Sequence, residues 1–217
     1  MRFIKGEAMD YTKESCREFA RRLASADPTP GGGGAAAAAA ALGAALGEMV
    51  AALTVGKKRY AAVEEEIKTA AAELDRLREE LLDMVMEDAR GFIPLSRAYR
   101  LPKDEPGRED KLEEAALSAC AAPKKIMELG CRALELTAVM AEKGSVLAQS
   151  DAGCAAALIK AAVDSAALNV YINTKSLRDR EQADRLNRSC LEMQNGSDEL
   201  RREIYGKVRA SLLEPEK

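Results

Sequence analysis

Residues 26–60, "ADPTPGGGGAAAAAAALGAALGEMVAALTVGKKRY", place two prolines and four consecutive glycines directly before seven consecutive alanines. Glycine and proline interrupt regular structure, whereas alanine is the strongest helix former. The stretch therefore predicts a loop that leads abruptly into a helix over residues 34–55. We expect that helix to end at Gly56 and the cations Lys57, Lys58 and Arg59, which suit the negative end of a helix dipole.

The remainder of the chain has helical spacing. Aromatic residues make up 4% of the 217 residues, and no alternating run rich in Val, Ile and Thr indicates a strand. We expect an all-α fold, a single domain over residues 1–217 with about six helices, several of them long, and a short tail, "EPEK". The expected helices cover residues 10–25, 34–55, 61 to the loop "YRLPKDEPGRED" at 99–110, 109–142 with a kink at Pro123, 150–175, and 178–211 with an optional bend at "NGSDE".

Bulk composition excludes several classes of protein. Lys and Arg number 33 against 36 Asp and Glu, so no excess positive charge is available to hold nucleic acid. The five cysteines are widely spaced and contain no C-x-x-C pair, which indicates a reducing cytoplasm and no zinc site. The N-terminal "MRFIKGEAMD" has no signal-peptide apolar region, and the uncharged residues 28–47 are too weakly apolar to predict a membrane span. We expect a soluble cytoplasmic protein.

The chain contains no histidine. A Ser-His-Asp or Cys-His arrangement is therefore impossible, and the commonest proton carrier near neutral pH is missing. Any acid or base must be a carboxylate, lysine, tyrosine or cysteine.

The glycine run is a candidate ligand loop. Gly31, Gly33 and Ala36 match a dinucleotide fingerprint formally, but that fingerprint needs a preceding strand, and no G-K-[ST] follows to make a phosphate loop. A side-chain-free loop at a helix N-terminus still offers backbone N–H groups to a carboxylate, a phosphate or a planar amide-bearing ligand. The alternative is that the glycines only permit a sharp turn between packed helices.

A carboxylate falls on the apolar stripe of the third helix. Its apolar residues alternate at spacings of four and three, from Val63 to Leu81 and Met84, and the next position is Asp88. Burial would raise the pKa of Asp88 toward neutrality, as an enzyme without histidine would need of its acid or base. The alternative is that the stripe ends earlier and Asp88 is exposed.

Two amides lie on the fifth helix, which Ser150 or Asp151 should cap. The stripe Ala155, Leu158, Ala162, Ser165, Asn169, Ile172 places Asn169 among small apolar residues, with Asn173 one turn further on. Such an amide needs a partner, either another helix or a ligand with a donor and acceptor edge such as a pterin.

Alanine and glycine on the second and fifth helices allow axes to approach to about 8 Å. Such faces form either a tightly packed monomeric core or subunit contacts, and we expect a homodimer.

Three segments together resemble the cyclodeaminase/cyclohydrolase family, which comprises the C-terminal domain of formiminotransferase-cyclodeaminase and stand-alone methenyltetrahydrofolate cyclohydrolases. They are "PTPGGGGAAA...ALGAALGEMVAALTVGKKRY", "EDARGF...AYRLPK" and "SDAGCAAALIKAAVDSAALNVYIN", in the family's order and over nearly the whole chain. The resemblance implies an all-helical dimeric enzyme that acts on one-carbon derivatives of tetrahydrofolate without a metal or redox cofactor. The formiminotransferase half is not expected within these 217 residues.

The resemblance also suggests roles for individual residues. Asp88 matches the functional acid or base best, and Glu48, a charge within an apolar helix, is the second candidate. Candidates for contact with the pterin, the one-carbon bridge or other substrate groups are Pro30, Gly31, Gly32, Gly33, Asp151, Asn169 and Asn173. The cations Lys57, Lys58, Arg97 and Lys103 could meet the carboxylates of one or several glutamates, or could be a solvated cap.

Two close reactions fit these groups. A cyclohydrolase adds water to 5,10-methenyltetrahydrofolate and yields 10-formyltetrahydrofolate, whereas a cyclodeaminase closes the 5-formimino derivative and expels ammonia. The sequence does not separate them, and the missing transferase half favours the cyclohydrolase. A non-catalytic helical dimer that acts as a scaffold is the third alternative, and Asp88 within its motif argues against it.

Overall fold

The computed structural model describes residues 10–213, so the expectations for the start of the chain and for the tail "EPEK" lie outside the described residues. Within this range the chain forms helices and no strand. The α-helices are α1 Cys16–Leu23, α2 Gly32–Ala52, α3 Glu64–Tyr99, α4 Arg108–Ala119, α5 Ala121–Lys143, α6 Gln149–Thr174 and α7 Arg180–Leu213, and the short 3-10 helices are η1 Tyr11–Lys13, η2 Lys58–Tyr60 and η3 Val146–Ala148. The all-α prediction is confirmed.

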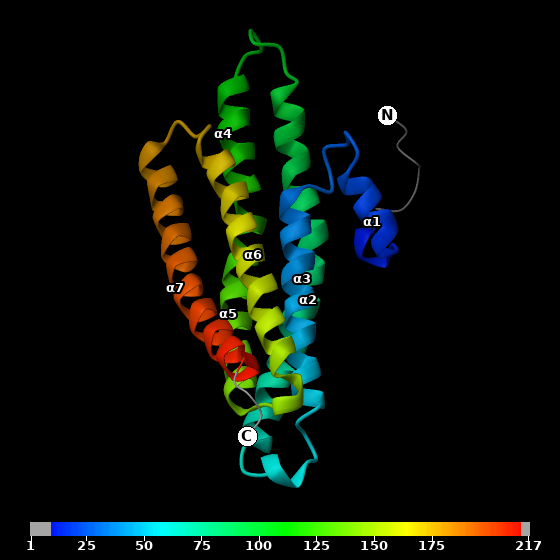
Figure 1. Cartoon of the computed structure of the whole chain (residues 1–217). Coiled ribbons are helices and arrows are strands. Elements are labelled where there is room, and N and C mark those ends of the chain that lie inside the picture. Colours follow the sequence, from blue (N-terminus) through cyan, green and yellow to red (C-terminus); the bar gives the residue numbers. More distant parts are fainter. Residues whose placement is uncertain (1–9, 214–217) are drawn as a thin grey trace.

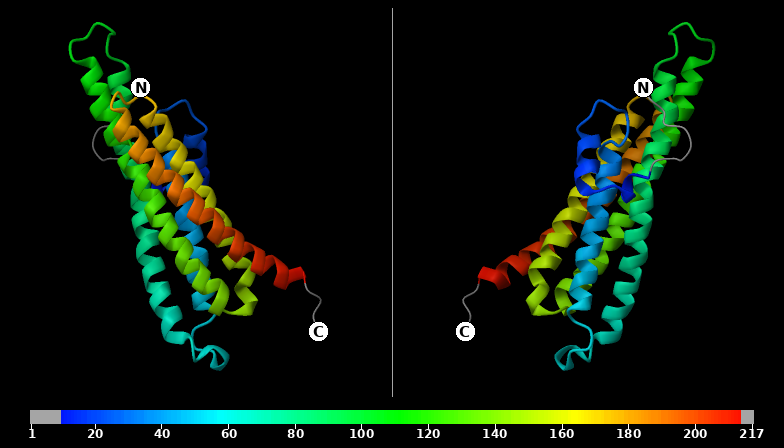
Figure 2. Two further views of the ribbon diagram at one scale, coloured as in Figure 1. Left: turned by 90° about the vertical axis from the view of Figure 1, so that its left-hand side faces the viewer. Right: turned by 90° about the vertical axis from the view of Figure 1, so that its right-hand side faces the viewer.

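The long helices run side by side as an elongated bundle (Figure 1). Helix α2 packs against α3, α5 and α6, and α7 covers α5 and α6 on the opposite side. Helices α3 and α4 extend beyond the other helices at one end, and the short α1 stands beside the bundle (Figure 2). No residue of α1 is buried. The core therefore lies between α2, α3, α5 and α6.

Small residues allow α2 to occupy this central position. Its buried residues are almost all alanine and glycine, as the sequence indicated. At Gly43 a Cβ would lie 2.5 Å from Ile159 Cγ1 and 3.1 Å from the carbonyl oxygen of Ala155. The backbones of α2 and α6 thus approach more closely than any side chain at this position would permit.

Most expected helices appear near their predicted bounds, with several differences. The expected helix over 10–25 is a 3-10 turn followed by α1, because Asp10 and Ser15 each accept a backbone N–H and start separate elements. Helix α6 begins at Gln149 directly after η3, so the cap expected at Ser150 or Asp151 was wrong. Helix α7 is continuous from Arg180 to Leu213, through the "NGSDE" segment where we allowed a bend.

The expected helix over 109–142 is two helices that meet at Cys120, three residues before Pro123. The predicted disturbance at Pro123 is therefore confirmed as a break. The Cys120 N–H bonds the carbonyl of Leu117 in a tighter turn, and regular pairing resumes with the bond from the Lys124 N–H to Cys120.

The apolar stripe predicted for α6 is only partly correct. Ala155 and Ala162 are buried as expected, but Leu158 and Ile172 are exposed. The larger side chains on the buried side of α6 are Ile159, Val163, Val170 and Asn173. Alanine surrounds both sides of this helix, so its periodicity cannot distinguish the core side from the neighbouring side. On α3, Val85 rather than Met84 continues the buried stripe, and Asp88 lies half-buried at its edge.

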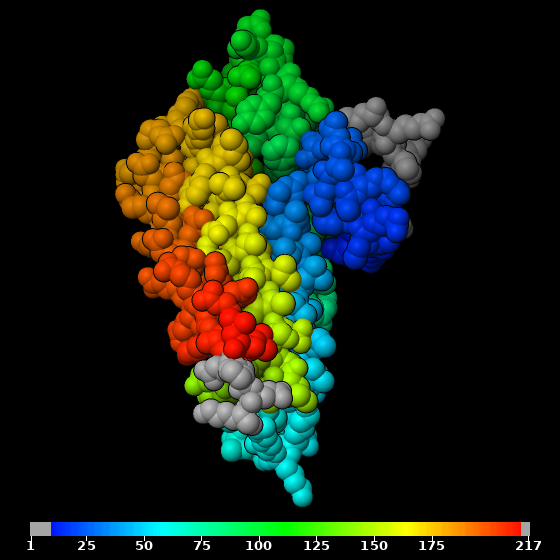
Figure 3. All heavy atoms as spheres, in the orientation of Figure 1, coloured from blue at the N-terminus to red at the C-terminus, as the bar shows by residue number. Residues whose placement is uncertain are grey.

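Helix α2 and the segment Val146–Thr174 are long and apolar enough, by length and composition alone, to cross a membrane. Half of each apolar window is buried inside the bundle, as in the core helices of globular proteins. Figure 3 shows the outer sides of α2 and α6 as neighbouring bands on one face of the molecule.

The contact at Gly43 predicts an unusual response to Gly→Ala substitution. We expect Gly43→Ala to lower the free energy of unfolding, because overpacking costs about 1–3 kcal/mol and outweighs a gain of about 1 kcal/mol in helix propensity. At Gly196 in α7 a Cβ would meet nothing within 4 Å, so Gly196→Ala should raise stability by about 0.5–1 kcal/mol. Urea unfolding measures both, and equal effects of the two changes would contradict the close α2–α6 contact.

Candidate active site

A cavity of about 170 Å³ lies at the end of the bundle where α2 begins and α6 ends. It brings together residues from four separate parts of the sequence: the loop and first residue of α2, α3, the junction of α4 and α5, and the last turns of α6. The lining residues are Pro28, Thr29, Gly31, Gly32, Asp88, Phe92, Ala119, Pro123, Asn169, Ile172 and Asn173. Five predicted site residues therefore meet around one space, namely Gly31, Gly32, Asp88, Asn169 and Asn173.

The N-terminus of α2 forms one wall of the cavity. Gly31 is the N-cap residue and offers no side-chain bond, and the first intrahelical bond comes from the Ala35 N–H to its carbonyl at 3.0 Å. The backbone N–H groups of Gly32, Gly33 and Gly34 therefore have no partner within the helix. They carry the positive end of the helix dipole toward the cavity.

The Asp88 carboxyl group lies directly against this helix end. A Cβ on Gly33 would be 2.0 Å from Asp88 Oδ1, so only glycine at position 33 leaves room for the carboxyl group. Burial raises the pKa of Asp88 to about 6, and a hydrogen bond from the Gly34 N–H opposes the rise. No cation among the described residues contributes to the pKa of Asp88. Both its charged and its neutral form are thus accessible near neutral pH.

The two asparagines line the same cavity from α6, and each is held by a backbone carbonyl. Asn169 Nδ2 donates to the Ser165 carbonyl at 2.8 Å, and a Cβ on Gly32 would lie 3.2 Å from the same nitrogen. Asn173 is 7% exposed, and its Nδ2 donates to the Ala119 carbonyl at 3.0 Å. Each amide nitrogen therefore donates to a backbone carbonyl, and each amide oxygen is left to accept a hydrogen bond from a ligand.

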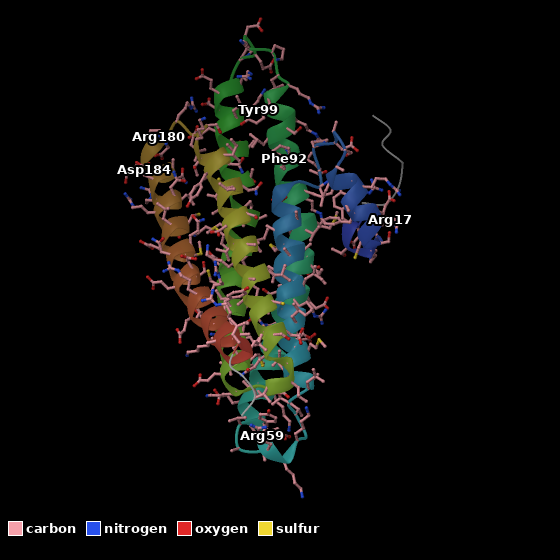
Figure 4. All side chains as sticks on the ribbon, in the orientation of Figure 1. Arg17, Arg59, Phe92, Tyr99, Arg180 and Asp184 are labelled. Carbon is pink, nitrogen blue, oxygen red and sulfur yellow. The ribbon has the colours of Figure 1, made fainter. Side chains whose placement is uncertain are left out.

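Apolar groups and a hydroxyl complete the walls. Phe92 lies on α3 four residues after Asp88, at the level of the loop before α2 (Figure 4), and Ile172 lines the cavity from α6. Thr29 is tied to the N-terminal segment by a 3.1 Å hydrogen bond between its Oγ1 and Tyr11 Oη. Sequence reasoning missed Phe92 as a lining residue, although its helical spacing from Asp88 is a signal that could have found it.

Pro30 and Gly33 are buried next to the lining residues but do not line the cavity themselves. Gly33 leaves the space that the Asp88 carboxyl group occupies. The other candidate carboxylates lie elsewhere. Glu48 is fifteen residues along α2 from Gly33, about 22 Å at the helical rise. Its Oε1 accepts a 2.8 Å bond from Arg78 Nε in an ion pair. Asp151, in the first turn of α6, also lies at the end of its helix away from the cavity.

The candidate cations are divided between the two ends of the bundle. Lys57 and Lys58 are exposed next to Arg59 at the end opposite the cavity (Figure 4). Arg97 is exposed and lines a separate depression between α3 and α4 with Lys111 and Glu114. Lys103 is exposed in the loop that joins these two helices. Within one chain, none of the four lines the cavity.

Residues 10–213 contain no cluster of three or more Cys, Asp or Glu side chains able to hold a metal ion. No cysteine lines the cavity, and burial raises the pKa of Cys120 and of Cys131 to about 11. Asp88 is therefore the one titratable side chain among the lining residues.

Comparison with known proteins identifies the family of this chain. A sequence profile of the formiminotransferase-cyclodeaminase family matches residues 15–192. A methenyltetrahydrofolate cyclohydrolase of Methylorubrum extorquens is 37% identical over 203 residues, which are 92% of this chain and 98% of that protein. The formimidoyltransferase-cyclodeaminase of Rattus norvegicus is 32% identical over 80% of this chain, which spans only 33% of that longer protein.

A solved structure extends the comparison to the fold. The crystal structure of a formiminotetrahydrofolate cyclodeaminase from Thermotoga maritima superposes with a TM-score of 0.78 at 28% sequence identity. The match covers 92% of this chain and 96% of the Thermotoga chain.

The raised pKa of Asp88 predicts a pH-dependent stability difference. In the unfolded chain the pKa of this carboxyl group is near 3.9, so the folded state binds the proton more tightly than the unfolded state does. Protonation therefore stabilises the folded state at low pH, and this contribution is lost as the pH rises through about 6. Asp88→Asn removes the ionisation, so the variant should be more stable than the wild type at pH 8, by up to about 3 kcal/mol. Urea unfolding should show this difference shrink between pH 8 and pH 5, and a pH-independent difference would contradict a buried carboxyl.

Proposed function

This chain belongs to the formiminotransferase-cyclodeaminase family, and from that membership we propose that it hydrolyses 5,10-methenyltetrahydrofolate to 10-formyltetrahydrofolate. The observation that carries the proposal is the Asp88 carboxyl group, half-buried and without a cation, in a cavity walled by a helix N-terminus and two amides. The 37% identity to a methenyltetrahydrofolate cyclohydrolase over most of both chains supports the choice of reaction.

The proposed chemistry moves one proton on and off Asp88. The ionised carboxyl group takes a proton from a water molecule while the water oxygen attacks the methenyl carbon between the two substrate nitrogens. The protonated carboxyl then returns a proton to N5 as the bond from this carbon to N5 breaks, and the hydroxyl proton is released as the formyl group forms. A pKa of about 6 suits both steps, since the group must accept and donate near neutral pH.

The dimensions of the cavity indicate which part of the substrate enters. Its volume of about 170 Å³ lies below the roughly 300–1,000 Å³ of sites that enclose a drug-sized ligand. We therefore place the pterin ring and the one-carbon bridge inside, near Asp88 and the two asparagines. The glutamate part, with one or several carboxylates, extends outside, and the candidate cations Arg97 and Lys103 are exposed at this end of the bundle.

A cyclodeaminase is the second candidate. The Thermotoga relative and the rat relative carry this activity in their names, and the reaction forms a tetrahedral carbon between the same two nitrogens. The same carboxyl could protonate the departing ammonia. Loss of methenyl absorbance and release of ammonia from the 5-formimino substrate, measured side by side, distinguish the two activities, and a protein inactive in both assays would be the scaffold alternative.

We also propose that the protein is a homodimer through the outer face of α2 and α6. This face carries Leu42, Leu168 and Ile172, each more than 60% exposed, with Met49 and Leu158 along the same helices. Exposed side chains of this size on two neighbouring helices indicate a surface that another protein surface covers. Because Ile172 also lines the cavity, a second copy on this face would border the substrate site.

We expect Asp88→Asn to lower kcat by roughly 100-fold or more, the loss expected when a general acid or base is removed, while substrate binding stays within a few-fold. The substitution keeps the size of the side chain but removes its titratable proton. Steady-state loss of methenyl absorbance gives both values. Asp83→Asn, an equivalent change on the exposed side of α3, is the matched control and should leave kcat unchanged.

A near-normal kcat for Asp88→Asn would exclude the assignment and move the test to Glu48. Cys154 is exposed on α6 away from the cavity lining, so Cys154→Ala should leave turnover nearly intact. Complete loss of activity in that variant would instead indicate a thiolate nucleophile.

Light scattering at micromolar concentration should give a mass twice the 23.3 kDa of one chain. Leu168→Asp places a charge on the most exposed of these side chains and should shift the protein to the monomer. Leu212→Asp on α7 makes the same change at a similarly exposed leucine outside this face and should leave the dimer intact. A monomeric wild type would contradict the proposal.

A further inference from the structure

The break between α4 and α5 leaves one backbone carbonyl without its helical donor. In a continuous helix the Ala119 carbonyl would accept from the N–H of residue 123. Residue 123 is proline, which has no N–H. Ala119 and Pro123 are both buried, so this carbonyl needs another partner.

Asn173 of α6 supplies that partner. Its Nδ2 donates to the Ala119 carbonyl at 3.0 Å, across a sequence separation of 54 residues. The next carbonyl, that of Cys120, is already paired with the Lys124 N–H at 3.1 Å. Asn173 therefore occupies the one acceptor that the proline leaves open at this junction.

This bond determines which way the Asn173 amide points. Only the NH₂ group of an amide can donate to a carbonyl, so Nδ2 must face Ala119 and Oδ1 must face away from it. Ala119, Pro123 and Asn173 all line the cavity. Among the described residues, every fully buried side-chain oxygen or nitrogen has a hydrogen-bond partner. No protein group donates to Asn173 Oδ1, so this oxygen is not fully buried and is accessible from the cavity.

Asn169 is oriented in the same sense. Its Nδ2 is used by the Ser165 carbonyl, which leaves Oδ1 as its acceptor. The α6 side of the cavity therefore presents two amide oxygens, whereas the α2 side presents backbone N–H donors. A ligand that matches both sides carries N–H donors on one edge and an acceptor near them.

We propose that Pro123 is a positioning residue that, by leaving the Ala119 carbonyl unpaired, holds Asn173 as a hydrogen-bond acceptor for the N–H donor edge of the substrate's pyrimidine ring. The 2-amino group and the ring N–H of a reduced pterin are such donors, and the adjacent ring carbonyl is an acceptor. The inference rests on the proposed function, since it assigns the recognition of that substrate.

Substitution of Pro123 by alanine tests the proposal. Pro123→Ala provides an N–H for the Ala119 carbonyl, which then no longer depends on Asn173 as its hydrogen-bond donor. The amide is then able to rotate and to present either its oxygen or its nitrogen. We expect KM for 5,10-methenyltetrahydrofolate to rise about five- to tenfold with kcat within twofold, because Asp88 is untouched.

Thermal unfolding separates this role from a merely structural one. A proline-to-alanine change in a helix adds a donor and removes a poor helix former, so the melting temperature of Pro123→Ala should stay equal or rise. Pro94→Ala is the matched control, since Pro94 lies within α3, is exposed and does not line this cavity. It should leave KM unchanged.

A second variant gives a rescue. Asn173→Asp alone sets a carboxylate oxygen against the Ala119 carbonyl and should raise KM by more than tenfold. In the Pro123→Ala background the new N–H pairs with that carbonyl, and the carboxylate still offers an acceptor to the cavity. The double variant should therefore have a lower KM than Asn173→Asp alone.

The proposal is overturned if Pro123→Ala leaves KM unchanged, or if the two substitutions raise KM additively. A readout without turnover keeps this result distinct from failure of the proposed reaction. Hydrogen exchange of the Asn173 side-chain amide, followed by ¹⁵N NMR, should be slow in the wild type and faster in Pro123→Ala. Equal exchange rates would overturn the positioning role even if the protein catalyses neither folate reaction.

Discussion

The structure depends on contacts in which α2 offers almost no side chain between its backbone and its neighbours. At Gly43 this allows Ile159 of α6 to reach the α2 backbone, and at Gly33 it allows the Asp88 carboxyl group to do the same. A single methyl group at either position would fill space that another residue occupies. The glycines and alanines of α2 thus explain both the close packing of the bundle and the location of its carboxyl group.

The same contact determines the electrostatics of the site. Burial removes Asp88 from water, and no cation offsets the lost hydration of its charged form. The hydrogen bond from the Gly34 N–H offsets only part of this loss, so the pKa of Asp88 is about 6. Glu48 provides the contrast, because its ion pair with Arg78 satisfies a carboxylate that also lies within an apolar helix. A paired carboxylate stabilises the bundle, whereas an unpaired one reduces stability at neutral pH and is able to exchange a proton.

Proline has a parallel role at the other side of the cavity. Pro123 interrupts the helical ladder, and the unpaired carbonyl is satisfied by a side chain from a helix 54 residues away in the sequence. The cavity is therefore built where regular backbone pairing stops twice, at the start of α2 and at the junction of α4 and α5. Unpaired backbone groups at both places supply polar character that the alanine-rich helices themselves lack.

The sequence by itself determined the helical class, most helix spans, the glycine loop at a helix start and the position of Asp88 near an apolar stripe. These features depend on local propensity and on spacing of three and four residues, which a sequence displays directly. Only the tertiary structure decided that Asn169, Asn173, Phe92 and Pro123 line one cavity with Asp88. It likewise placed four other candidates away from this cavity, namely Lys57, Lys58, Asp151 and Glu48. It also decided which side of α6 is buried, because alanine on both sides removes the periodic contrast that would have shown it. Contacts between distant segments depend on how helices cross, and helical periodicity does not encode the partner.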